Sequence, residues 1–293
     1  MSWFSDQLAC LPSRLLPQHA ISRLIYVLAR SRRPWFKQLL INGLVRAYRV
    51  DLADAQQPDP HDYPDFVSFF TRALRDGARP VAGDEQTLVS PADGALSVHG
   101  RIDGDRLLQA KGRSFTLGEL LGGDFQLADE LSDGEFCTVY LAPRDYHRVH
   151  MPLAGTLRSM THIPGRLFSV QGATARHVDR LYARNERLVC VFDTAAGPLV
   201  VVLVGALLVS SITTVWAGEI NPHGDRKRLW RQTYPASGAG SVHLARGAEL
   251  GHFAMGSTVI VLVPAGRLSW DAALHAGVAL RCGEALGTVT PAD

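Results

Sequence analysis

Cysteine is scarce in this sequence, and the few cysteines that occur are far apart. They stand at positions 10, 137, 190 and 282, without a Cys-x-x-Cys pair or the close spacing of a disulfide framework. This distribution suits a reducing compartment, and it excludes both a cysteine zinc site and a small disulfide-stapled fold. The chain must therefore be stabilised by a hydrophobic core, for which 293 residues with 46% hydrophobic content suffice.

Long apolar runs are also missing. The longest extends over about 15 residues from Pro198 to Ile212 and is interrupted by Gly205, whereas a membrane-spanning helix needs about 20 apolar residues. Its valine-rich composition predicts buried strands instead. Met1 to Pro12 lack a positively charged lead-in, and no small-residue cleavage site follows an apolar stretch, so we expect no secretory signal. We predict a protein that does not cross the membrane.

A large net charge is missing as well, because the formal total is only +2. The molecule as a whole is therefore not expected to bind nucleic acid or another polyanion. Acidic residues are almost absent from residues 1–50, where only Asp6 occurs, so attraction to an anionic surface should start in this segment. Its eight basic residues are Arg14, Arg23, Arg30, Arg32, Arg33, Lys37, Arg46 and Arg49.

The same N-terminal segment places apolar residues at helical spacing, with Pro34 suited to the first turn of a second helix. Two amphipathic helices with arginine flanks are typical of a membrane interface. The alternative is a helical cap packed on the core, and periodicity does not say what the apolar face touches. The apolar positions are Ile21, Leu24, Ile25 and Leu28, then Phe36, Leu39, Leu40 and Leu44, with Trp3, Phe4 and Trp35 nearby.

Beyond residue 50 the sequence changes character. Residues 51–62 are polar and predict a linker, and Pro64–Arg75 predicts a third helix. From about residue 85, glycines and Asp-Gly turns at 93–94 and 133–134 separate short strands, with one short helix near 117–122. The expected strands are Leu88–Ser90, Ala95–Ile102, Leu107–Ala110, Cys137–Leu141, Gly155–His162, Leu188–Asp193, Leu199–Val204, Ile212–Ala217 and Thr258–Val263.

Repeated strand–helix units are absent from this pattern, which argues against a doubly wound parallel sheet. We predict an α+β fold, with N-terminal amphipathic helices followed by a mostly antiparallel β core. Residues 1–60 would form the helical region and linker, and residues 61–293 the β-rich domain.

Candidate chemistry lies first at Ser257, which follows Gly256 and precedes an apolar strand. Alone, a Gly-Ser step is usually a tight turn, and this one lacks the Gly-x-Ser-x-Gly pattern of a nucleophile elbow. Asp93 follows a strand in Val89–Gly94, where the alternative is a simple hairpin turn. Asn185-Glu-Arg187 fits a charged surface turn.

The segment Ala142–Pro152 is more distinctive, because His147 and His150 stand in one polar loop. Histidine titrates near neutral pH and shuttles protons. The spacing would also suit a metal, but no convincing third ligand stands nearby and His-x-x-His is not a zincin motif. We therefore predict no metal.

Together these segments resemble the bacterial, pyruvoyl-dependent, membrane-associated phosphatidylserine decarboxylases. The similar segments follow the family's order, and Met255 replaces a leucine common in the family, a volume-conserving change. They are Phe69–Arg72, Ser90–Gly94, Leu108–Gly112, Pro143–Pro152, Pro164–Val170, Ala183–Arg187, Val204–Ala206, Val215–Gly218 and Gly256–Thr258.

The resemblance implies a charge-relay set in which Asp93 orients His150 and His150 takes the proton of Ser257. Ser257 would attack the Gly256 carbonyl and cut this zymogen into a β chain, residues 1–256, and an α chain, residues 257–293. Ser257 would become a pyruvoyl cofactor that forms a Schiff base with phosphatidylserine. The products are phosphatidylethanolamine, which belongs to phospholipid biosynthesis, and carbon dioxide. The resemblance also implies that His147 places the substrate carboxylate and is the acid that protonates the α-carbon.

A lipid substrate favours membrane contact for residues 1–60, peripherally on the cytoplasmic face of the bacterial inner membrane. The family also implies association of the α and β chains, followed by homodimerisation. Three alternatives remain: a pyruvoyl decarboxylase acting on a soluble amino acid, an uncleaved lipid-binding module, and a hydrolase using Ser257 and His150. The residues that hold the phosphate are not evident from the sequence.

Overall fold

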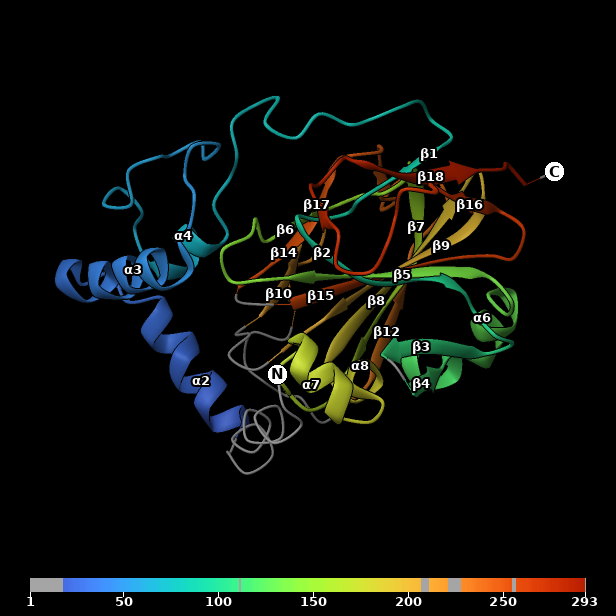
Figure 1. Cartoon of the computed structure of the whole chain (residues 1–293), viewed down its shortest axis with the longest axis horizontal. Helices are drawn as coiled ribbons and strands as arrows, with labels where there is room; N and C mark the ends of the chain where they lie inside the picture. Colours follow the sequence, from blue (N-terminus) through green and yellow to red (C-terminus); the bar gives the residue numbers. More distant parts are fainter. Residues whose placement is uncertain (1–17, 111, 207–210, 221–227, 255–256, 293) are drawn as a thin grey trace.

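The computed structural model describes residues 18–110, 112–206, 211–220, 228–254 and 257–292. Two N-terminal helices stand beside a large β core (Figure 1). They are α2 (Gln18–Ala29) and α3 (Pro34–Tyr48), which has Pro34 in its first turn, as predicted. Arg49 ends α3 in the left-handed conformation, with its N–H donating to the Val45 carbonyl. Within the described residues, no helix is both long and apolar enough to cross a bilayer.

The predicted third helix at Pro64–Arg75 is wrong in length. Helix α4 covers only Phe66–Phe70, with Asp65 as its N-cap accepting from the Ser68 N–H. Beyond it the chain turns back on the linker, where the Gln56 N–H donates to the Ala73 carbonyl and the Arg75 N–H donates to the Asp54 carbonyl. These bonds to the linker replace the helical bonds that would have continued α4.

The core is a nine-stranded sheet, and every pairing between its strands is antiparallel, which confirms the predicted type of core. The order is β12-β7-β8-β9-β15-β5-β2-β17, with β13 also on β7. The strands are β2 (Gly94–Arg101), β5 (Glu135–Leu141), β7 (Gly155–Ile163), β8 (Arg187–Thr194), β9 (Gly197–Val204), β12 (Trp230–Thr233), β13 (His243–Leu244), β15 (Ser257–Val263) and β17 (Ala279–Leu280).

Strand β15 lies at the centre of this sheet, between β5 and β9, and is buried along its whole length. Its residues alternate between two hydrophobic clusters, with Val259 in one and Ile260 in the other. A strand buried on both faces has a continuous apolar sequence, which is why the pattern predicted it well. Ser257 is thus the first residue of the most enclosed strand.

The first cluster is covered by two small sheets, of order β11-β10-β14-β6 and β1-β18-β16. The second is covered by short helices and the β3-β4 hairpin. Only the helix near 117–122 was predicted, and all four helices here are too short to give a clear periodic signal. The elements are β1 (Thr87–Val89), β3 (Arg106–Ala110), β4 (Arg113–Thr116), β6 (Arg148–His150), β10 (Ile212–Thr214), β11 (Gly218–Ile220), β14 (Glu249–Phe253), β16 (Leu268–Trp270), β18 (Ala285–Val289), α5 (Leu117–Leu120), α6 (Phe125–Glu130), α7 (Gly172–His177) and α8 (Leu181–Arg184).

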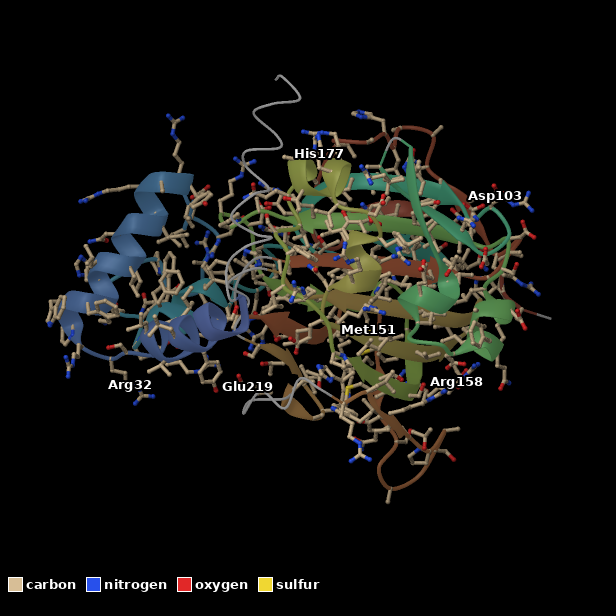
Figure 2. All side chains as sticks on the ribbon, turned by 90° about the horizontal axis from the view of Figure 1, so that it is seen from below. Arg32, Asp103, Met151, Arg158, His177 and Glu219 are labelled. Carbon is tan, nitrogen blue, oxygen red and sulfur yellow. The ribbon has the colours of Figure 1, made fainter. Side chains whose placement is uncertain are left out.

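The helical region contacts the core through polar groups, and a third hydrophobic cluster holds its own helices together. Arg30, which directly follows α2, forms an ion pair with Glu219 at 2.9 Å. The third cluster joins Ile41 of α3 to Phe69 and Phe70 of α4. Figure 2 shows the helices to one side of the β core, with Arg32 on the helical part and Glu219 where that part meets the core.

Candidate active site

Ser257 is held in the interior at the start of β15. It pairs with Leu141 of β5 and is fully buried. Its Oγ has no hydrogen-bond partner among the described residues, whereas buried hydroxyls are normally satisfied. Gly256, the predicted cleavage partner, lies outside the described residues. The hydroxyl of Ser257 is therefore buried and, among the described residues, not engaged by another polar group.

His147 is also fully buried, and its ring stacks on Phe70 with the ring centroids 4.0 Å apart. Its Nε2 lies 3.1 Å from the Ala142 carbonyl, which can only accept, so the proton is on Nε2. Burial, together with the charge of Arg72, lowers the pKa of His147 to about 3. The ring is thus neutral, and its Nδ1 lone pair has no partner in the described part of the chain.

The backbone places His147 and Ser257 at the same end of the sheet. Ala142, which accepts from His147, directly follows Leu141, the strand partner of Ser257. The Phe253 N–H donates to the His147 carbonyl at 3.2 Å, four residues before Ser257. Two buried polar atoms without partners, Ser257 Oγ and His147 Nδ1, therefore occur in neighbouring segments.

His150 ends β6 and has a partner on each ring nitrogen. Its Nδ1–H donates to the Gly247 carbonyl at 2.8 Å, and its Nε2 lies 3.0 Å from the Tyr146 hydroxyl. Burial is the largest influence on the pKa of His150 and lowers it, while burial raises the pKa of Tyr146. His150 is therefore neutral near pH 7, with its Nε2 lone pair accepting from Tyr146. This is the protonation state that a general base requires.

Asp93 is fixed by Arg79. Arg79 Nε lies 2.8 Å from Asp93 Oδ1 and Nη2 lies 2.6 Å from Oδ2, while the Cys282 N–H donates to Oδ1 at 2.8 Å. The described hydrogen bonds of Asp93 thus go to Arg79 and Cys282, and none joins it to His150. Its negative charge nevertheless acts on His150 and raises the pKa of that ring slightly against burial.

The Asp-Gly step at 93–94 does not close a hairpin, which was the alternative interpretation of Asp93, because β1 pairs with β18 while β2 pairs with β5. Gly94 is required by a close approach of the chains. A Cβ at this position would lie 2.3 Å from the Tyr140 carbonyl oxygen. Glycine therefore lets β2 begin against β5 and fixes Asp93 at that edge.

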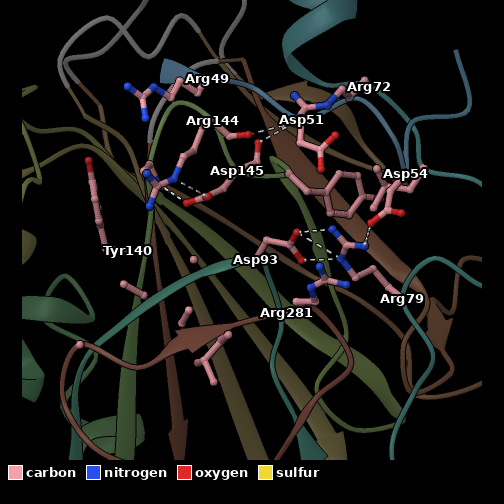
Figure 3. A pocket seen from close by; sticks show the side chains of 18 residues that line it. Arg49, Asp51, Asp54, Arg72, Arg79, Asp93, Tyr140, Arg144, Asp145 and Arg281 are labelled. Carbon is pink, nitrogen blue, oxygen red and sulfur yellow. Dashed lines mark hydrogen bonds and ion pairs between the residues drawn. The ribbon is translucent and has the colours of Figure 1, made fainter. Parts of the chain in front are cut away.

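Sequence reasoning missed the residues that hold the candidates in place. Arg79 also forms an ion pair with Asp54 at 2.8 Å, so it joins the linker to Asp93 (Figure 3). Gly247 has a φ of +78°, and this left-handed turn contains the carbonyl that accepts from His150. From the sequence, Gly247 would have indicated only a turn. No feature of the sequence around Arg79 indicated its role.

A pocket of about 430 Å³ opens beside these residues (Figure 3). Asp93, Ala142 and Tyr146 form part of its wall, together with several arginines. In the described part of the chain, no group of three or more His, Cys, Asp or Glu side chains is placed to hold a metal ion. The arrangement offers a buried nucleophile, two neutral imidazoles and a basic cavity next to them.

Known proteins resemble this chain over most of its length. The family model described as phosphatidylserine decarboxylase matches residues 66–288, and a second model, described as PSD, matches residues 8–49. Proteins named phosphatidylserine decarboxylase proenzyme are similar. The one from Methylococcus capsulatus is 52% identical over 94% of both chains. The one from Pseudomonas paraeruginosa is 51% identical over 97% of both, and the one from Alkalilimnicola ehrlichii is 56% identical over 84% of this chain and 85% of its own.

Proposed function

The chain belongs to the phosphatidylserine decarboxylase family, and we propose that it cuts itself between Gly256 and Ser257 and then converts phosphatidylserine to phosphatidylethanolamine and carbon dioxide. The observation that carries this proposal is the Ser257 hydroxyl, which directly follows Gly256 in the sequence, is buried at the start of the central strand and has no partner among the described residues. The hydrolase alternative is disfavoured because Ser257 lacks the Gly-x-Ser-x-Gly context of a nucleophile elbow. The presence of Asp93, His147, His150 and Ser257 together argues against an uncleaved binding module.

Self-cleavage uses groups of the chain alone. Ser257 Oγ attacks the Gly256 carbonyl carbon, and its proton passes to His150 Nε2 and from there to the Ser257 nitrogen. The peptide C–N bond then breaks to give an ester and a free amine. For this, Tyr146 must first release the Nε2 lone pair that it now occupies. Loss of the Ser257 α-proton then breaks the ester C–O bond, frees the Gly256 carboxylate and leaves dehydroalanine. Water then displaces the nitrogen of this dehydroalanine, which departs as ammonia and leaves the pyruvoyl carbonyl. Asp93 stabilises the protonated His150 through its charge.

The surroundings of Ser257 fit a pyruvoyl group formed in this way. A carbonyl there supplies the electron acceptor that decarboxylation needs and that ordinary side chains lack. Ser257 lies in a central strand that is buried along its whole length, so the protein would enclose this group. His147 Nδ1 is unoccupied by any described group. We assign to His147 the proton that the α-carbon receives once carbon dioxide has left.

We expect the His147→Ala protein to cut its own chain normally. Its decarboxylation rate should fall at least about a hundredfold, because that is the usual contribution of a positioned acid or base. The two chains are counted on a denaturing gel, and phosphatidylethanolamine is measured from vesicles. His162→Ala is the matched control, because His162 is equally buried but contacts Glu186. Full turnover by the His147 variant would remove His147 from the mechanism.

We further propose that the helical region docks on the cytoplasmic face of the inner membrane. Its apolar side chains are unusually exposed: 59% for Leu24 and 63% for Val27 on α2, and 67% for Trp35 and 63% for Leu39 on α3. Arg32 and Arg33 stand between the two helices. Apolar side chains flanked by arginines suit an anionic lipid surface. Homodimerisation, as the family implies, stays a prediction.

The protein should float with phosphatidylserine-containing vesicles, and Trp35→Ser/Leu39→Ser should reduce both flotation and vesicle turnover at least about tenfold, because each buried apolar side chain contributes to binding. Cleavage should be unchanged. Phe125→Ser is the matched control, since Phe125 is 71% exposed on α6, at the other end of the molecule from α3. A wild-type protein that never floats and decarboxylates a soluble amino acid would favour the soluble-substrate alternative.

A further inference from the structure

The basic pocket beside the active site lies between the helical region and the β core. Arg49, the residue that ends α3, lines one part of its wall, and Asp93, Ala142 and Tyr146 line another. Ala142 accepts from His147, and Tyr146 contacts His150. The pocket therefore connects the end of a membrane-facing helix with the residues assigned to catalysis.

The acidic side chains of this pocket are already engaged. Asp54 and Asp93 both form ion pairs with Arg79, at 2.8 and 2.6 Å. Asp145 accepts from the Ala142 N–H at 2.7 Å, and burial raises the pKa of its carboxyl. Apart from a long contact between Arg144 and Asp145, only Asp51 is left among the lining acids to balance the other four arginines of the wall. These are Arg49, Arg72, Arg144 and Arg281.

Arg72 is the most informative of the four, because it is only 4% exposed. One of its terminal nitrogens, Nη2, donates to the Arg144 and Asp145 carbonyls at 3.0 and 3.3 Å. Its Nε and Nη1 are buried and have no partner in the described residues. A guanidinium buried with unsatisfied N–H groups is costly unless an anion approaches it.

The other three arginines are more accessible. Among the described contacts, the guanidinium groups of Arg49 and Arg281 make no ion pair, and Figure 3 shows Arg281 next to the Arg79–Asp93 pair. Arg144 is 67% exposed, and its carboxylate contact is a long one, 3.7 Å to Asp145. These groups are free to turn toward a ligand without losing a strong contact.

We propose that this pocket binds the phosphodiester of the phospholipid head group, with Arg72 at its base and Arg144, Arg281 and Arg49 around it. Guanidinium groups suit phosphate oxygens, which stay ionised throughout the physiological pH range. The inference rests on the proposed function. A short chain of bonds separates the phosphate of phosphatidylserine from its amine. A phosphate here therefore keeps the amine near Ala142 and Tyr146, the wall residues that contact His147 and His150.

The test measures binding by calorimetry in the full-length Ser257→Ala protein, which cannot turn over its ligand. The probes are glycerophosphoserine, the soluble head group, and inorganic phosphate. We expect glycerophosphoserine to bind more tightly, and Arg144→Gln and Arg281→Gln each to weaken it about tenfold, as loss of a charge-assisted hydrogen bond does. Arg101→Gln is the matched control, since Arg101 is 69% exposed and pairs only with Asp133 among the described residues.

Several outcomes would overturn the pocket assignment: no binding of either probe, equal loss of affinity in the Arg101 variant, or binding of inorganic phosphate alone, which would mark a free-phosphate site.

The Arg144→Gln and Arg281→Gln substitutions in the cleavable protein should raise KM for phosphatidylserine about tenfold with kcat unchanged, because they remove contacts made equally before and during reaction. Decarboxylation without head-group binding would refute only the pocket. Binding without decarboxylation would refute the proposed function and leave the pocket standing.

Discussion

Ser257→Ala is expected to yield one uncut chain with no measurable decarboxylation. The substitution removes the only atom that can attack the Gly256 carbonyl in our account, and with it the precursor of the electron acceptor. The fold should survive, because Ser257 Oγ makes no hydrogen bond within the described residues. Deleting an unsatisfied hydroxyl therefore costs little stability.

The matched control for this variant is Thr138→Ala. Thr138 is also buried with a hydroxyl that lacks a described partner, and it lies on β5 opposite Ile260, away from the cleavage point. The control should be cut normally. Two chains from Ser257→Ala, separated on a denaturing gel, would place the cleavage elsewhere and refute the assignment of Ser257.

His150→Ala should slow self-cleavage by at least about a hundredfold, since a positioned general base contributes that much or more. The Nδ1–H of the ring donates to the Gly247 carbonyl, and the Nε2 lone pair can accept the proton once the Tyr146 hydroxyl has released it. The rate is measured by following the appearance of the two chains after synthesis. His162→Ala again controls for loss of a buried imidazole, and cleavage of the His150 variant at the normal rate would contradict the base role.

The same assignment fixes the pH dependence of cleavage. A base acts in its deprotonated form, and burial lowers the pKa of His150 below its ordinary value of 6.5. The cleavage rate should therefore be constant above pH 6.5 and should fall only as the pH drops through the lowered pKa. A midpoint above 6.5 would mean that another group limits the reaction.

The parts of the fold that could be predicted are those whose local pattern agrees with their surroundings. Strands β9 and β15 are buried on both faces, so their sequences are continuously apolar. Helix α4 was predicted too long because its end depends on bonds to the linker, which no local pattern contains. The Asn185-Glu-Arg187 segment was expected at the surface, but Asn185 and Arg187 are buried. Their partners, such as the Phe168 and Leu120 carbonyls, are distant in sequence.

In the candidate site, too, some residues could be predicted from local patterns and others could not. Asp93, His147, His150 and Ser257 were named from motifs, and the structure adds their surroundings without testing their roles. Arg79 could not be found, because its meaning lies in contacts with Asp54 and Asp93 across the fold. The neutral state of His147 also depends on burial and on Arg72, neither of which its own loop reveals.

The mass spectrum of the denatured protein tests the central claim most directly. The account predicts two species, one ending at Gly256 and one spanning residues 257–293 that is lighter by one ammonia than a peptide beginning with serine. That difference is the signature of a pyruvoyl group. A single full-length mass from protein that decarboxylates phosphatidylserine would contradict the account, because the activity would then proceed without cleavage at Ser257.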